Sequence, residues 1–335
     1  GRGAHEGATV AVTKDKRAVV YMGEDARFEY IYKFVSRDAV KPGGFAANRD
    51  LLDHGTLYVA RFDANGRGVW LPLVHGQGAL HAGNGFADQG EVVIRSRQAS
   101  DLLGATKMDR PEWVVVDKEG WVYTALTNNS NRGGDKQPAV DAANPRVNNT
   151  QGNIIRWKED AANQAAVKFT WDIYLFGAEA ADKPDVNLSG LTAVNDFASP
   201  DGLYFDPRGM LWIQTDDGAY TDVTNCMMLA AVPGKVGDGT TATAAGGTAT
   251  IKGANASAET VRRFLVGPKD CEITGVVVTP DGKTLFCNVQ HPGENGTLAK
   301  ATSAWPDSQT TTGSTKRPRS ATFVVTRKDG GNIGN

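Results

Sequence analysis

Short apolar runs, each closed by a tight turn, recur along most of the chain. Three copies join two apolar strands across a turn that contains Asp and ends in Gly, at residues 113–123, 203–213 and 276–286. Weaker copies occupy residues 10–21 and 58–66. Asp can accept hydrogen bonds from its own backbone and Gly tolerates a positive φ, so each copy predicts a β-hairpin.

The spacing of these hairpins predicts the fold class. They recur at intervals of roughly 70 to 90 residues, with further strand pairs between them, which is typical of four-stranded propeller blades. We therefore expect an all-β chain, a single β-propeller domain over residues 1–335 with about four or five blades. Long inserted loops are expected near residues 128–151 and 234–258, which are rich in small and polar residues. A β-sandwich is the competing fold, and helices are expected only at 48–54 and 91–103.

Composition excludes several classes of function. The 335 residues carry a net charge of −2 and 22% charged side chains, so no basic field points to nucleic acid. No apolar run approaches the roughly 18 residues of a membrane span. The chain opens at Gly1 without Met or an export signal, and we expect it to lack an N-terminal part.

The three cysteines, Cys226, Cys271 and Cys287, show no metal-binding spacing. Two interpretations stay open. Cys226 and Cys271 could form a disulfide, or all three could be buried thiols.

Four acidic residues precede the first strand of a hairpin, whereas Asp15, Asp117, Asp206 and Asp281 occupy turns. They are Glu6, Glu112, Asp201 and Glu272. In a propeller the starts of these strands meet at one end of the central channel, so the four carboxylates are expected to converge. Crowded carboxylates need cations, and calcium suits oxygen ligands. The alternative is four separate surface acids.

Arg110, in the segment Asp109-Arg110-Pro111-Glu112, is the candidate for binding an oxyanion. A guanidinium beside a metal cluster would bind a tetrahedral anion through two hydrogen bonds. An ordinary ion pair with Asp109 or Glu112 is the alternative. His5 and His291 are further candidates as ligands or bases, although a lone histidine is more often structural.

Several of these segments resemble those of one enzyme family, the PhoX family of bacterial alkaline phosphatases. The matching segments span nearly the whole chain in the family's order: 1–8, 23–35, 108–129, 144–157, 199–218 and 271–294. The resemblance implies a six-bladed propeller in the complete enzyme. It also implies an exported, monomeric, periplasmic or extracellular protein that uses calcium and iron to hydrolyse phosphate monoesters.

The resemblance also implies roles for particular residues. Glu6, Glu112, Asp201 and Glu272 align with the family's carboxylate metal ligands, and Arg110 aligns with the arginine that contacts the substrate phosphate. The implied mechanism is metal-assisted hydrolysis, in which the metals and Arg110 absorb the developing charge. The family's iron–thiolate ligand and a further acidic ligand are expected upstream of Gly1.

Two other functions remain open. A calcium-dependent propeller hydrolase of the gluconolactonase type would also gather carboxylates at a channel mouth. A propeller acting only as a binding module would keep the hairpins without metal-dependent turnover. Arg110 favours a phosphatase, because a lactone has no dianion for a guanidinium to bind.

Overall fold

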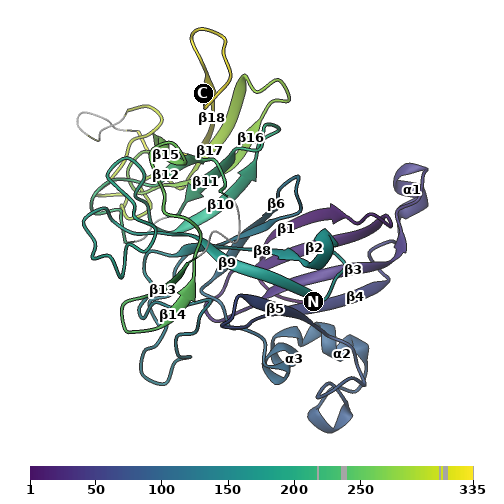
Figure 1. Ribbon diagram of the computed structural model, residues 1–335. Helices are drawn as coiled ribbons and strands as arrows, with labels where there is room; N and C mark the ends of the chain where they lie inside the picture. The colour runs from purple at the N-terminus through teal and green to yellow at the C-terminus, as the bar shows by residue number, and fades with distance from the viewer. Residues whose placement is uncertain (217–218, 235–239, 309–310, 312–315, 335) are drawn as a thin grey trace.

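The chain folds into four successive antiparallel blades of a β-propeller (Figure 1). The computed structural model describes residues 1–335 except 217–218, 235–239, 309–310, 312–315 and 335. The expected hairpins are all present. The prediction of an all-β propeller with four or five blades is confirmed by the sheet order within these described ranges.

The first two blades share one sheet of nine strands. The strands of the first blade are β1 (His5–Val12), β2 (Arg17–Glu24), β3 (Ile31–Ala39), β4 (Gly55–Phe62) and β5 (Arg67–Pro72). Those of the second blade are β6 (Pro111–Val116), β7 (Val122–Leu126), β8 (Asn153–Glu159) and β9 (Lys168–Phe176). Arg67–Val69 of β5 pair with Lys168–Thr170 of β9, and β1 and β6 at the two ends of the sheet lie against each other. The sheet therefore curls almost into a barrel.

The third and fourth blades are separate sheets. The third blade contains β10 (Pro200–Phe205), β11 (Leu211–Thr215), β12 (Met227–Ala231) and β15 (Val261–Val266). The fourth contains β16 (Glu272–Val278), β17 (Thr284–Gln290) and β18 (Ala321–Thr326). Strand β10 contacts β6, and β16 contacts β10. The first strands of the four blades thus follow one another around a common centre.

Aromatic side chains fill the inside of the curled sheet. Trp70 and Trp157 are fully buried, with ring centroids 5.8 Å apart. Their indole groups and the hydroxyl of Tyr21 donate hydrogen bonds to the buried carboxylate of Glu159, which also pairs with Lys33. These two tryptophans are therefore core residues, and their polar atoms are satisfied by one acid.

Helices are few, and both expected ones have different bounds. The structure has α1 (Gly44–Asn48), α2 (Gln89–Ile94) and α3 (Ser96–Leu103), with the 3-10 turns η1 (Ala82–Asn84) and η2 (Asp160–Ala162). The helix expected at 48–54 is wrong: α1 ends at Asn48, whose side chain bonds Lys41 and Gly44. The helix expected at 91–103 is broken at Arg95, where φ is −108° and ψ is 40°.

The two expected insertions differ from each other. Residues 128–151 form turns without a helix or strand. Residues 234–258 include the small hairpin of β13 (Thr241–Thr243) and β14 (Ala249–Ile251), and the part at 235–239 lies outside the described residues. The Thr250 hydroxyl donates to the Ala142 carbonyl at 2.7 Å, so the insertions contact each other.

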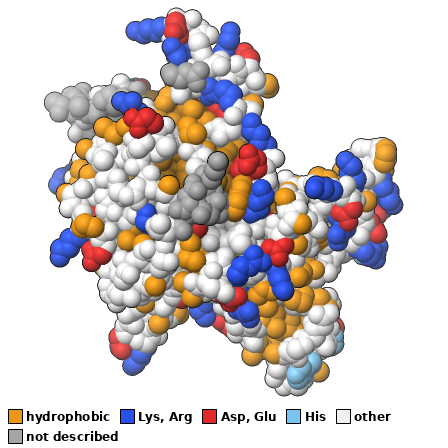
Figure 2. Space-filling model, in the orientation of Figure 1, with side chains coloured by type: hydrophobic (Ala, Val, Ile, Leu, Met, Phe, Trp, Pro, Cys, Tyr) orange, Lys and Arg blue, Asp and Glu red, His pale blue; other side chains and the backbone are white. Residues whose placement is uncertain are grey.

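The structure also decides between the two interpretations of the cysteines. Cys226, Cys271 and Cys287 are all buried and none of them forms a disulfide, so the disulfide alternative is wrong. Figure 2 shows Lys and Arg side chains intermixed with Asp and Glu on the visible face, in keeping with the low net charge. Among the described residues, no helix combines the length and apolar character that crossing a bilayer requires.

Close packing of the first blade on the second depends on Gly23. A Cβ atom at this position would lie 2.2 Å from the carbonyl oxygen of Glu112, so Gly23→Ala must push β2 away from β6. We expect this substitution to lower the free energy of unfolding by about 1–3 kcal/mol. The midpoint of denaturant unfolding measures the effect. Gly234→Ala is the control, because a Cβ there has no neighbour within 4 Å; equal midpoints for the two variants would contradict the prediction.

Candidate active site

Four carboxylates lie at the starts of the four central strands. Glu6, Glu112 and Asp201 are the second residues of β1, β6 and β10, and Glu272 is the first residue of β16. Because these strands are neighbours around the centre and enter from the same end, their first side chains gather at one mouth. The structure therefore brings together the residues that the sequence predicted to converge.

Two groups of potential ligand atoms occupy this mouth. Carboxylate oxygens of Glu6, Asp25 and Glu112 all lie within 4.8 Å of one another. In the second group, atoms of Asp216, Glu272 and His291 also lie within 4.8 Å of one another. Asp201 lies between the two groups electrostatically. Burial raises the pKa of its carboxyl most, and the charges of acids from both groups raise it further: Glu272, Asp216, Glu6 and Asp25. One acidic centre thus extends across all four blades.

Asp25 and Asp216 were not among the residues expected at the site, and His291 was expected only as an isolated candidate ligand or base. Each directly follows the second strand of a hairpin, since β2 ends at Glu24, β11 at Thr215 and β17 at Gln290. The antiparallel register pairs these ends with the starts of the first strands: His5 with Glu24, Pro200 with Thr215, and Glu272 with Gln290. Following the register from each turn would have found all three.

The other histidine candidate lies outside both groups. His5 is exposed, and its Nε2 lies 2.8 Å from the carbonyl oxygen of Gly1. His291 Nε2 instead lies 3.4 Å from Oε2 of Glu272, and its Nδ1 lies 3.2 Å from Glu294. Only His291 of the two belongs to the site.

Unusual backbone conformations surround the mouth. Arg110, Ser199 and Asp270 have φ values of 55°, 50° and 53°, and each stands two residues before one of the carboxylates. The strand register then shifts shortly after the carboxylate in all four hairpins. Left-handed residues other than Gly cost on the order of 1–3 kcal/mol and cluster at functional sites, and bulges redirect side chains. The same local geometry therefore aims an acid inward from three blades.

Burial and then the charges of neighbouring acids raise the proton affinity of Glu112, Asp201 and Glu6. Burial raises the pKa of Glu112 far above its ordinary value, and the charges of Asp201 and Asp25 raise it further. Burial also raises the pKa of Asp201. Partial desolvation is the largest cause of the raised pKa of Glu6, and the charges of Asp25 and Glu272 raise this pKa further. Six carboxylates share this mouth, so bound positive charge there would relieve their mutual repulsion.

Arg110 lies at the edge of the first group. Its Nε and Nη2 donate to the two oxygens of Asp25 at 2.9 and 3.3 Å, and Nη2 lies 3.3 Å from Glu112. The guanidinium is partly exposed, at 24% of the side-chain surface. Burial works against its charge, but the hydrogen bond and charge of Asp25 outweigh it and raise the pKa of Arg110.

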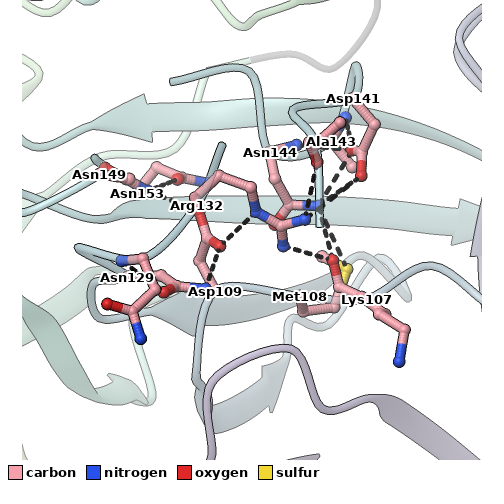
Figure 3. Close-up of polar contacts among 12 residues, drawn as sticks. Lys107, Met108, Asp109, Asn129, Arg132, Asp141, Ala143, Asn144, Asn149 and Asn153 are labelled. Atoms are coloured by element: carbon pink, nitrogen blue, oxygen red, sulfur yellow. Dashed lines mark hydrogen bonds and ion pairs between the residues drawn. The ribbon is translucent and has the colours of Figure 1, made fainter. Parts of the chain in front are cut away.

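Of the two ion pairs considered for Arg110, the one with Asp109 is not formed. Asp109 is fully buried and accepts hydrogen bonds from Arg132, Asn129 and Asn149 at 2.8, 2.9 and 3.0 Å (Figure 3). The polar residues of the insertion at 128–151 thus form a buried network beneath the segment that carries Arg110.

The mouth has the properties of a site for hard cations. The Asp201 Oδ1 atom is buried and has no hydrogen-bond partner, which is costly unless a cation completes it. Carboxylate oxygens from several strands are the ligands that calcium prefers. Burial raises the pKa of Cys271 to about 12 and that of Cys287 to about 11, which disfavours their thiolate forms.

Comparison with known proteins identifies the family. The profile of the family described as alkaline phosphatase PhoX matches residues 1–293. The chain belongs to this family. A solved structure of Pseudomonas fluorescens PhoX, in complex with the transition-state analogue vanadate, is 44% identical and superposes with a TM-score of 0.84. That match covers 100% of this chain and 55% of that protein, so the chain spans about half the length of this relative.

More distant comparisons add little. A protein of unknown function from Dyadobacter fermentans is 10% identical over 86% of this chain and 63% of that protein, with a TM-score of 0.30. This likeness carries no argument. The search of curated proteins found no match.

The raised pKa of Glu112 predicts how the free energy of unfolding depends on pH. In protein stripped of metal by a chelator, folded Glu112 holds a proton that the unfolded chain releases above pH 4.5. Its stabilising effect is therefore complete below that pH and is lost as the pH rises towards the elevated folded pKa. The expected loss is about 1.4 kcal/mol per pH unit for each such proton.

Thermal unfolding at pH 5 to 9, with and without Ca²⁺, measures this dependence. Glu112→Gln is the matched control and should show a shallower loss of stability with rising pH. The same slope in both proteins would rule out Glu112 as the group that takes up the proton.

Proposed function

We propose that this chain carries the metal-dependent site of a phosphatase that hydrolyses phosphate monoesters and releases inorganic phosphate. Glu6, Glu112, Asp201 and Glu272 would hold the metals, and Arg110 would bind the phosphate. The observation that carries the proposal is the arrangement of Arg110 and Glu112. A partly exposed guanidinium lies 3.3 Å from a carboxylate of a cluster that requires cations.

The geometry of Arg110 suits an incoming anion. Its contacts with Asp25 and Glu112 use Nε and Nη2, which leaves Nη1 for a phosphate oxygen. Asp25 fixes the plane of the guanidinium, and a fixed donor costs less entropy on binding. Arg110 would stabilise the charge that develops on the oxygens of the transferred phosphoryl group.

Calcium at the carboxylates is part of the proposal. Bound metals would supply Lewis-acid stabilisation of the phosphoryl oxygens and activation of the nucleophile. The alternating acids of the mouth, from first-strand starts and second-strand ends, would orient these ions around Arg110. The family resemblance adds iron, and we assign its thiolate ligand to none of the three buried cysteines.

Further parts of the proposal rest on the family resemblance alone. We propose small-molecule phosphate monoesters as substrates, a monomeric enzyme, and a location in the periplasm or outside the cell. A gluconolactonase-type hydrolase is less well supported, because a neutral lactone makes no use of Arg110. A binding module without turnover leaves the crowded acids unexplained.

Loss of the guanidinium should weaken anion binding without unfolding the protein. We expect Arg110→Ala to reduce the affinity for phosphate and vanadate by about tenfold to a hundredfold, since a hydrogen bond to a charged group contributes about 1.5–3 kcal/mol. Isothermal titration in the presence of Ca²⁺ measures the change. Arg61→Ala removes another ion-paired arginine, bonded to Asp63 at 3.0 Å, and should leave the affinity unaltered. Undiminished phosphate binding by Arg110→Ala would refute the assignment.

Loss of one carboxylate charge should lower metal binding. We expect Glu112→Gln to bind less calcium and to lose turnover of p-nitrophenyl phosphate, because an amide is a weaker ligand than a carboxylate. Elemental analysis and the phosphatase assay, before and after EDTA, measure the two effects. Glu119→Gln changes an exposed turn acid and serves as the control. Equal metal content in wild type and Glu112→Gln would remove Glu112 from the site.

A further inference from the structure

Arg132 is a buried cation that contacts the segment leading into Arg110. It is 1% exposed and its Nε donates to Asp109 Oδ1 at 2.8 Å. Its Nη2 donates to the Lys107 carbonyl at 2.6 Å and its Nη1 to the Ala139 carbonyl at 3.1 Å (Figure 3). One planar group thus fixes both the backbone and the carboxylate immediately before Arg110.

The same guanidinium also contacts the segment that follows Asp25. It lies over the ring of Phe28, 4.9 Å from the centroid. The Phe28 amide donates to the Met108 carbonyl at 2.9 Å, and Arg27 forms a β-bridge with Asp109. The segments that carry Asp25 and Arg110 therefore meet on Arg132.

Both segments are held in conformations that need support. Arg110 has a φ of 55° and Phe28 a φ of 68°, in the left-handed region that residues other than Gly rarely adopt. Such conformations persist only where the surroundings fix them from several directions. Asp109 is fixed in this way by its hydrogen bonds from Arg132, Asn129 and Asn149.

We propose that Arg132 is a positioning residue, which holds Arg110 and its partner Asp25 in the geometry that receives a tetrahedral oxyanion. This inference rests on the proposed function. Arg132 itself touches neither the acids of the mouth nor Arg110 in the contacts described, so it acts through Asp109 and Phe28. A displacement of about 1 Å in a binding group can cost a hundredfold in rate.

A second buried pair provides a matched control. Arg156 and Asp172 on β8 and β9 form two hydrogen bonds of 2.6 and 3.0 Å, with both side chains at most 2% exposed. The chemistry and burial match those of the Arg132–Asp109 pair. Arg156 contacts Trp121, Tyr123 and Tyr174 instead of residues of the site.

The experiment compares the double variants Arg132→Met/Asp109→Asn and Arg156→Met/Asp172→Asn, each of which removes both partners of a buried ion pair. Arg132 Nη1 also lies 3.9 Å from Asp141, whose side chain is 41% exposed, so the carboxylate that loses this contact is accessible to water. Three properties are measured: the unfolding midpoint, the dissociation constant for vanadate with Ca²⁺ present, and the Nε–Hε NMR signal of Arg110. Both variants should lose stability. Only the first should weaken vanadate binding, by about tenfold or more, and shift the Arg110 signal.

A conservative variant and a double-mutant cycle with Arg110→Ala make the outcome decisive. Arg132→Lys keeps the charge but loses the planar guanidinium. It replaces the double variant if that protein fails to fold. It should also weaken vanadate binding and shift the Arg110 signal, but by less. In an Arg110→Ala background, loss of the Arg132 pair should weaken vanadate binding no further. Equal effects of the two buried pairs on vanadate, or an unshifted Arg110 signal, would overturn the positioning role.

Failure of the inference is distinguishable from failure of the proposed function. If Arg110→Ala leaves vanadate binding unchanged, the proposed function is wrong. The NMR signal of Arg110 then still reports whether Arg132 fixes its geometry. If Arg110→Ala weakens binding but loss of the Arg132 pair does not, only the positioning role fails.

Discussion

Repulsion between carboxylates is the constraint on which the functional end of this molecule depends. Six acids from four blades face one mouth, and burial denies Glu112, Asp201 and Glu272 the screening that water gives on an open surface. Among the described contacts, Arg110 and His291 face these acids. Bound protons or bound metal ions would each reduce the repulsion. The shape of the mouth therefore depends on how these charges are neutralised.

The backbone maintains this unfavourable arrangement. Left-handed residues before Glu112, Asp201 and Glu272 and bulges after them recur from blade to blade. Gly7 and Gly23 let the first blade approach the second closely enough for Glu6 to reach Glu112, since a Cβ at either would meet backbone atoms within 3 Å. Left-handed residues and bulges thus act together on Glu112, Asp201 and Glu272, while a bulge and close packing act on Glu6.

The sequence was sufficient for the features that local chemistry determines. Asp and Gly in the turns predicted the hairpins, and the acids before the strands predicted Glu6, Glu112, Asp201 and Glu272 as neighbours. Asp25 and Asp216 were missed, although the antiparallel register followed back from each turn places them beside the first-strand acids. The pairing of β5 with β9, the break at Arg95 and the partner of Asp109 were out of reach. Each depends on tertiary contacts between residues far apart in the sequence.

The nine-stranded sheet makes the two halves of the mouth mechanically unequal. Glu6, Asp25 and Glu112 stand on blades that share a continuous ladder of backbone hydrogen bonds through β5 and β9. Asp216, Glu272 and His291 stand on two blades whose sheets are separate, and which meet through side-chain packing. The half that includes Arg110 is thus held together by backbone hydrogen bonds between its two blades, whereas the other half depends on packing between two separate sheets.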